Sequence, residues 1–183
     1  MDIYLLLKFL HVVSAVVWVG GGLCMTVLGV FASSRKDDAE MLRVVGNVAF
    51  LANRWFIPWS LLTLVFGLVA AYLGSLYSQL WIMLGLAGFA STFLTGALVL
   101  GPLSEKIRQL KAEGKDNEAF PIGRTLLQAA KFDYVVMFVV IADMVLKPGF
   151  GDLATIAVMA LILVAGAVVF LLPLLRSRGA MPA

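Results

Sequence analysis

Charged residues are scarce in this chain of 183 residues. Asp, Glu, Lys and Arg together make up 14% of the sequence, whereas soluble domains carry about 25%. Apolar residues make up 62%, and the mean hydropathy is +1.00. This composition excludes a soluble globular domain and predicts a single transmembrane domain over residues 1–183.

Cysteine and histidine are nearly absent. The single cysteine, Cys24, excludes both an intrachain disulfide and a CxxC redox pair. The single histidine, His11, excludes ligation of haem by two histidines of the same chain. The sequence also contains no Walker loop, GxSxG elbow or HExxH motif. The sequence therefore identifies no catalytic residue, and whether the chain is an enzyme is left open.

The apolar residues are gathered in runs as long as membrane-crossing helices. About 20 residues cross the hydrocarbon core as a helix. The runs predict an all-α helical bundle with five transmembrane helices, at about residues 4–32, 55–77, 80–101, 126–146 and 153–175. The first run is too long for a signal peptide and has no basic segment before it, so we expect it to remain as a span.

The stretches between these runs predict how the spans begin and end. Residues 41–53 are apolar but interrupted by Arg43 and Asn47, which predicts an interfacial helix and a bend near Asn53. Pro102 is expected to end the third span, because proline cannot supply the helical hydrogen bond. Residues 103–124 then predict a cytoplasmic loop, with a short amphipathic helix that Gly114 ends.

The basic residues lie mainly on one side of this layout. With the N-terminus outside, only Lys8 and Lys147 are on the outer side. Twelve are on the inner side: Arg35, Lys36, Arg43, Arg54, Lys106, Arg108, Lys111, Lys115, Arg124, Lys131, Arg176 and Arg178. Because basic residues collect in cytoplasmic loops, the distribution predicts an N-out, C-in multi-pass protein of a bacterial inner (plasma) membrane. The lipid bilayer is thus the expected partner, and nucleic acid is not expected as one.

His11 lies about two turns into the first predicted span. Ionisable residues inside a membrane are costly to bury and mark functional sites. The imidazole could ligate haem iron, relay a proton or bond a quinone carbonyl, or it could simply pack by bonding to another helix. Trp18 and Gly22 lie on the same helix face. Together with Gly20, the glycines Gly21 and Gly22 leave room either for a flat macrocycle or for a closely packed helix.

Three more charged residues lie within or at the edge of the predicted spans. Asp143 lies at a depth similar to that of His11, which predicts either a His11–Asp143 contact or an i,i+4 pair of Asp143 with Lys147. Arg54 and Asp133 lie near the inner boundary and could form an ion pair between helices. Alternatively, Arg54 extends to the lipid phosphates. If Arg54 points inward, it could hold an acidic group such as a haem propionate.

The third predicted span carries a stripe of small residues. Gly88, Thr92 and Gly96 follow at four-residue spacing, and Gly85 lies on much the same side. Small residues let membrane helices approach closely. The stripe therefore predicts close packing, either within the chain or against a second copy in a homodimer.

Short motifs along the chain resemble those of known membrane proteins. LKFLHVVSA at residues 7–15, followed by WVGGG at 18–22, looks like the first span of a family of predicted bacterial integral membrane proteins of unknown function. It is also similar to the broader group of CopD-type copper-resistance proteins and HemJ-type protoporphyrinogen oxidases. RWFIP at 54–58, followed by Thr63 and Gly67, resembles the second span of that group. MVLKP at 144–148 resembles the end of the fourth span in the unknown-function family.

The resemblance implies a role for His11. In HemJ-type proteins the first-span histidine is associated with haem b, which implies the same role here. The chain departs from that pattern because it has no second histidine. It also lacks the outer loops rich in His and Met that a copper importer would need.

Two functions follow from these observations. The first is a redox-linked membrane subunit that binds haem b, another porphyrin or a quinone, with His11 as the candidate metal ligand. The candidate cofactor-binding residues are His11, Trp18, Gly21, Gly22, Arg54 and Asp143. The alternative is a non-enzymatic protein: a transport subunit, an assembly factor or an anchor for a membrane partner subunit.

Overall fold

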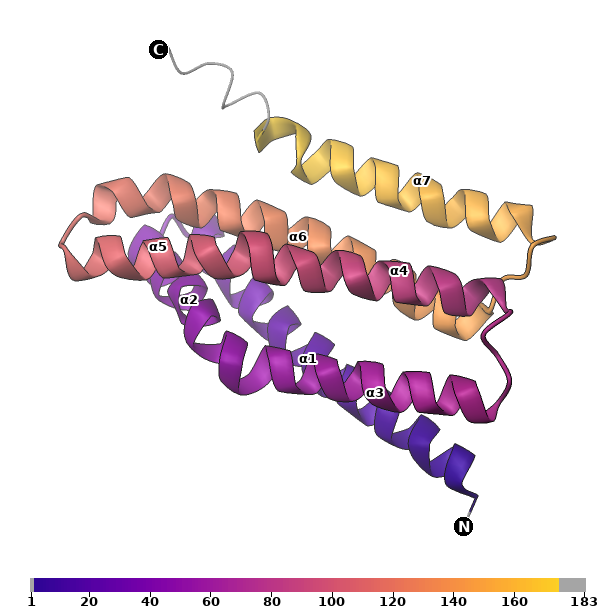
Figure 1. The fold of residues 1–183 in the computed structure, drawn as a ribbon. Helices are drawn as coiled ribbons and strands as arrows, with labels where there is room; N and C mark the ends of the chain where they lie inside the picture. Colours follow the sequence, from indigo (N-terminus) through magenta and orange to yellow (C-terminus); the bar gives the residue numbers. More distant parts are fainter. Residues whose placement is uncertain (1, 175–183) are drawn as a thin grey trace.

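The computed structural model describes residues 2–174, which fold into a bundle of long helices (Figure 1). This part of the chain contains no strand, so the predicted all-α class is confirmed over it. The elements in chain order are α1 (Ile3–Ser34), α2 (Asp38–Leu51), the π-helix η1 (Ala52–Phe56), α3 (Ile57–Leu73), α4 (Leu80–Thr95), the π-helix η2 (Gly96–Leu100), α5 (Gly101–Ala112), α6 (Asp116–Leu146) and α7 (Leu153–Phe170). Arg176, Arg178 and the last position of the fifth predicted span lie outside the described residues.

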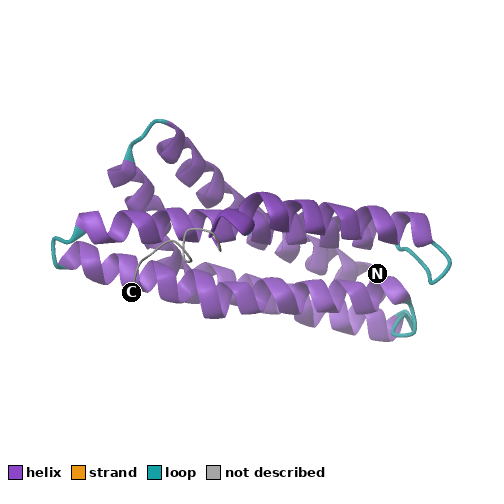
Figure 2. Cartoon of the chain, turned by 90° about the horizontal axis from the view of Figure 1, so that it is seen from above, coloured by secondary structure: helices purple, strands orange, loops and turns teal. Residues whose placement is uncertain are grey.

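The connections between the helices lie at the two ends of the bundle (Figure 2). Aspartates cap two helices that start there. The Asp2 carboxylate accepts from the Tyr4 N–H at 2.9 Å to begin α1, and Asp37 accepts from the Glu40 N–H at 2.9 Å to begin α2. At the end of α6, Lys147 adopts a left-handed conformation with φ of 49°.

Four helical stretches are long and apolar enough to cross a membrane. They are Ile3–Ser34, Asp38–Leu73, Leu80–Ala112 and Leu153–Leu174. α6 is not one of the four; it carries Lys131, Asp133 and Asp143 along its length. Among the described helices it has the most buried residues, and it contacts α1, α2, α4, α5 and α7. α6 is therefore the central helix of the bundle.

The helices run past some of the predicted boundaries. The chain is helical from Asp38 to Leu73 and changes direction at η1 (Figure 1). This helical stretch ends before residue 77, the predicted end of the second span. The prediction that Pro102 ends the third span is wrong, because the helix continues through η2 and α5 to Ala112. Most of the predicted loop at 103–124 is helical as well. The break covers residues 113–115, where Gly114 has a φ of +70°.

The two π-helical segments explain how helices continue past proline. Each segment ends two residues before a proline, Pro58 in α3 and Pro102 in α5. In an α-helix a proline ring would clash with the carbonyl four residues back. A π-turn widens the backbone there: the Ile57 N–H bonds the Ala52 oxygen, and the Gly101 N–H bonds the Gly96 oxygen, both five residues back. The extra residue in the turn makes room for the ring.

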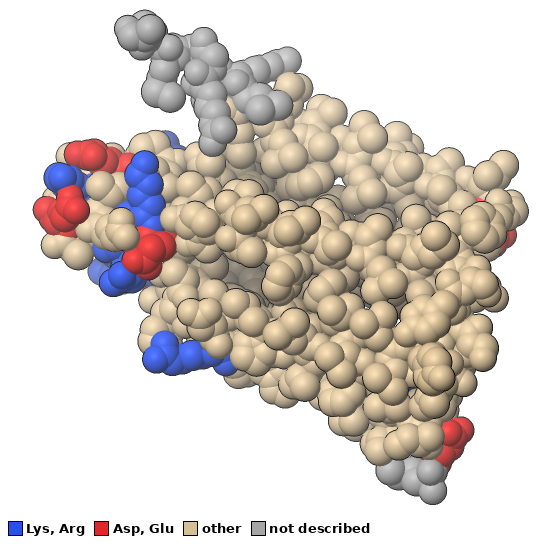
Figure 3. All heavy atoms as spheres, viewed as in Figure 1, with Lys and Arg blue, Asp and Glu red and all other residues tan. Residues whose placement is uncertain are grey.

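Charged side chains gather at one end of the bundle, where α2, α5 and the start of α6 meet (Figure 3). We call this the charged end. An ion pair of Arg124 with Asp38 joins α6 to α2 there at 3.1 Å. In the turn after α5, a hydrogen bond from Lys115 to the Glu113 carboxylate raises the pKa of Lys115 above its usual range.

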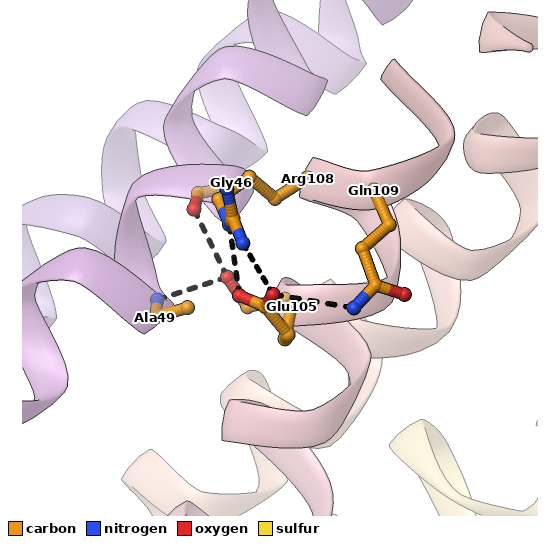
Figure 4. A network of polar contacts seen from close by, with 6 residues as sticks. Gly46, Ala49, Glu105, Arg108 and Gln109 are labelled. Carbon is orange, nitrogen blue, oxygen red and sulfur yellow. Dashed lines mark hydrogen bonds and ion pairs between the residues drawn. The ribbon is translucent and has the colours of Figure 1, made fainter. Parts of the chain in front are cut away.

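The side chain of Ser104 in α5 bonds the backbone of α2 beside these charges. Its hydroxyl is fully buried, donates to the Val45 oxygen at 2.7 Å and accepts from the Ala49 N–H at 3.0 Å. The next residue, Glu105, is bonded by Arg108 of its own helix (Figure 4). One hydroxyl thus bridges a turn of α2 and fixes α5 against it.

The small-residue stripe of α4 packs against α6 within the chain. A side chain at Gly88 would collide with Val140, and one at Gly85 would collide with Met144. Thr92 is also buried. Gly96 differs, because no described atom beyond its chain neighbours and the nearby backbone of its own helix lies within 4 Å of the position that its Cβ would take. The first two glycines therefore serve close helix packing, while Gly96 borders open space.

Candidate functional site

A cavity of about 470 Å³ lies between α1, α2, α4 and α6, on the side of the charged end. Both π-helical segments border it, through Ala52 and Asn53 of η1 and Gly96 and Ala97 of η2. π-Turns inside helices often occur at functional sites. α3 packs mainly on α1, and α4 packs mainly on α6. The surface is hollowed between the α2–α3 and α4–α5 stretches on the face shown in Figure 3.

Asp133 is the buried acidic group of this cavity. It projects from the middle of α6, its exposed fraction is 4%, and its Oδ1 atom has no hydrogen-bond partner among the residues that the structure describes. Burying an unpaired carboxylate is costly, and in a membrane the cost is not relieved by bulk water. The carboxyl group therefore carries a proton or is compensated by something held in the cavity.

Three hydroxyl groups that line the cavity with Asp133 already donate hydrogen bonds. Ser60 donates to the Ile57 oxygen at 3.0 Å, and Thr92 donates to the Phe89 oxygen at 3.0 Å. Tyr134 donates to the Val19 oxygen at 3.1 Å. Their oxygens keep lone pairs, so these three hydroxyls are available to a ligand as acceptors.

Two of the residues singled out in the sequence help to form this cavity. Trp18 and Gly22 of α1 line it, and the Trp18 ring lies 5.5 Å from that of Phe89. A side chain at Gly22 would collide with the Tyr134 hydroxyl, so glycine is what lets α1 and α6 approach here. Gly22 therefore leaves room for a closely packed helix, one of the two interpretations of the glycine run.

Gly21 also serves helix packing. Its Cβ would lie 2.5 Å from the Trp55 indole nitrogen, which donates to the Val17 oxygen at 3.3 Å. Gly20, in contrast, has nothing within 4 Å of its Cβ position.

His11 lies outside the cavity. Its Nδ1 atom is 2.7 Å from the Thr63 oxygen, and its ring lies against Gly67 of α3. A carbonyl oxygen only accepts, so Nδ1 donates in this bond, and Nε2 takes no part in it. Across the described residues, no group of three His, Cys, Asp or Glu side chains could hold a metal ion.

The two predicted contacts of Asp143 are wrong. Its exposed fraction is 1%, and neither of its carboxylate oxygens has a hydrogen-bond partner among the described residues, so its side chain bonds neither His11 nor Lys147. His11 bonds α3 instead, and the Lys147 ammonium lies 5.4 Å from the centre of the Trp81 ring. Asp143 is packed where α6 meets Gly85 of α4.

The predicted ion pair between Arg54 and Asp133 is also wrong. The Arg54 side chain is exposed, and its guanidinium lies 4.3 Å from the Phe50 ring centre. It does not line the cavity. The six candidate residues therefore do not form one site. Asp133, which the sequence suggests only as a partner for Arg54, is the buried acidic residue of the cavity.

Comparison with protein families identifies the chain more closely. Residues 5–148 match the family described as predicted integral membrane protein (DUF2269). The chain belongs to this family. Its matched residues cover α1 to α6, so α7 lies beyond the match. No curated protein and no solved structure matches the chain. The predicted membership of an unknown-function family is confirmed, while the likeness to CopD-type and HemJ-type proteins stays a prediction.

Proposed function

We propose that this DUF2269 protein binds a small molecule in its central cavity, as a transport subunit of a bacterial inner membrane. In this proposal α6 also crosses the membrane, which makes five spans in all, and the chain runs N-out and C-in. The four apolar helical stretches, the connections at both ends of the bundle and the charged end support that arrangement.

The proposal rests on one observation, the buried and unpartnered carboxyl group of Asp133 beside the cavity. A protein needs no buried, unpartnered carboxyl group for stability, because an apolar residue would pack there at lower cost. Intramembrane ionisable groups of this kind face substrate or ion pathways. Helix bundles commonly hold small molecules between their helices, in cavities of about 300–1,000 Å³.

The cavity suits binding or transport better than catalysis. Over residues 2–174 its lining holds no Cys, His or Lys, so this part of the chain supplies no nucleophile paired with a basic side chain. The acidic residues Asp133 and Glu105, the hydroxyl groups and the aromatic rings can hold a molecule and let it go again.

Two glycines offer a matched test. Gly96→Leu would fill the cavity, because the space beside Gly96 is open and Gly96 lines the cavity. Gly20→Leu places the same side chain in open space outside the cavity lining. Protein extracted with its native lipids should show a bound small molecule by native mass spectrometry in the wild type and in Gly20→Leu. The molecule should be missing from Gly96→Leu. An identical set of bound molecules in all three proteins would contradict the proposal.

A haem or quinone at His11 is the second candidate. One observation favours it: the Nδ1–H of His11 is bonded to a backbone oxygen, as in metal-ligating histidines, which leaves Nε2 for a ligand. His11 would be the single histidine ligand, and bound haem would supply electron transfer. The test is an oxidised-minus-reduced visible spectrum of the mildly purified protein. A Soret band lost in His11→Ala would support haem, and a flat wild-type spectrum would rule it out.

A further inference from the structure

The charges that line the cavity are of one sign. Among the described residues, Asp133 and Glu105 are the charged ones in its lining, and no Lys, Arg or His belongs to it. Glu105 is bonded by Arg108 at 2.9 Å, so its charge is compensated by its own helix. Asp133 has no such partner. When Asp133 is ionised, the uncompensated charge of the cavity is therefore negative.

Aromatic rings from four different elements surround the same space. Trp18 of α1, Phe56 of η1, Phe93 of α4 and Tyr134 of α6 all line it. The faces of such rings attract cations, and most strongly where water is excluded. The free lone pairs of Ser60, Thr92 and Tyr134 add electron-rich oxygen atoms to the same walls.

We propose that the cavity binds a hydrophobic organic monocation, a quaternary or protonated amine, with Asp133 as its counter-ion. This inference rests on the proposed function and names its ligand class. An anion would meet Asp133 without any basic residue to offset the repulsion. A neutral apolar molecule would leave the Asp133 carboxylate unpaired. A single positive charge on an apolar body satisfies both the carboxylate and the aromatic walls.

The test compares two probes of the same shape. Benzyltrimethylammonium is a monocation, and neopentylbenzene is its uncharged isostere, with carbon in place of nitrogen. Binding of each to the full chain in lipid nanodiscs is measured by saturation-transfer NMR, with empty nanodiscs subtracted. Three variants accompany the wild type: Asp133→Asn, Gly96→Leu, and Asp143→Asn as a matched control on the same helix outside the cavity.

We expect the cation to bind the wild type at least about 10-fold more tightly than the isostere, since a desolvated cation–π contact and an ion pair add together. Asp133→Asn should remove that preference, Asp143→Asn should keep it, and Gly96→Leu should reduce binding of both probes.

If both probes bind equally and Asp133→Asn changes neither, the cation inference is overturned while the binding cavity stands. If neither probe binds above empty nanodiscs, or if Gly96→Leu binds both like the wild type, the inference and the ligand-binding function fall together. If Asp143→Asn loses the preference as Asp133→Asn does, Asp133 is not the specific counter-ion.

Discussion

At the scale of single residues, three consecutive glycines in α1 have different surroundings. Gly22 faces the Tyr134 hydroxyl and Phe56, whereas Gly20 has nothing within 4 Å of its Cβ position. Gly22→Ala should lower the free energy of unfolding by about 1–3 kcal/mol, because forced overpacking costs that much. Gly20→Ala should be neutral or stabilising by up to about 1 kcal/mol, as alanine is the better helix former. Unfolding by SDS in mixed micelles measures both, and equal effects would show that the tight α1–α6 contact is absent.

The two buried aspartates of α6 should differ in chemical reactivity. Dicyclohexylcarbodiimide is an apolar reagent that adds to a protonated carboxyl group. Asp133 borders the cavity, whereas Asp143 is 1% exposed and packed against α4. We therefore expect peptide mapping by mass spectrometry to find the adduct on Asp133 and to find Asp143 unmodified. Preferential labelling of Asp143 would mean that the cavity does not admit the reagent. Asp133→Asn serves as the blank for the assignment.

The sequence indicated the importance of an aspartate within an apolar run but not its surroundings. Asp133 and Asp143 stand out by composition alone. Whether either pairs with Arg54 or His11 depends on how each helix is rotated about its axis. Spans that are apolar on all sides carry little periodicity from which to predict that rotation. Predictions from depth alone therefore failed for His11 with Asp143 and for Arg54 with Asp133.

At the scale of helices, the coupling of α2 to α5 depends on Ser104. Its hydroxyl is fully buried, donates to the Val45 oxygen and accepts from the Ala49 N–H. Ser104→Ala would leave these backbone groups without that partner, and an unsatisfied buried group costs about 1–3 kcal/mol. We expect the free energy of unfolding to fall by that amount. Thr95→Ala is the control, because the Thr95 hydroxyl bonds the Ser91 oxygen of its own helix. An equally large loss in Thr95→Ala would contradict a special role for the α2–α5 bridge.

The positions of helices were predictable from the apolar runs, but their continuation past proline was not. Pro102 is a helix breaker by the local rule, yet the chain stays helical because a π-turn directly precedes it. The same device precedes Pro58. A π-turn exposes backbone groups that neighbouring helices must accommodate, so it depends on tertiary packing that the local sequence does not encode.

At the scale of the whole molecule, the cavity lies in the part of the chain that matches the family. The match covers residues 5–148, and all the described residues that line the cavity lie within it. The only helix with which α7 makes substantial contact is α6. None of the described residues of α7 lines the cavity. The cavity therefore belongs to the part of the molecule from α1 to α6, with α7 added at its side.

The orientation in the membrane is tested by reporters in the turns between helices. If α6 is a span, the turn at 113–115 and the turn at 148–152 lie on opposite sides of the membrane. With the N-terminus outside, as the two-to-twelve division of basic residues predicts, a fluorescent protein inserted at 113–115 or fused to the C-terminus should be bright. A periplasmic phosphatase inserted at 74–79 or 148–152 should be active. The opposite pattern at all four positions would reverse the orientation while keeping five spans. The same reporter working at both 113–115 and 148–152 would show that α6 does not cross, and Asp133 would then lie on a helix outside the bilayer.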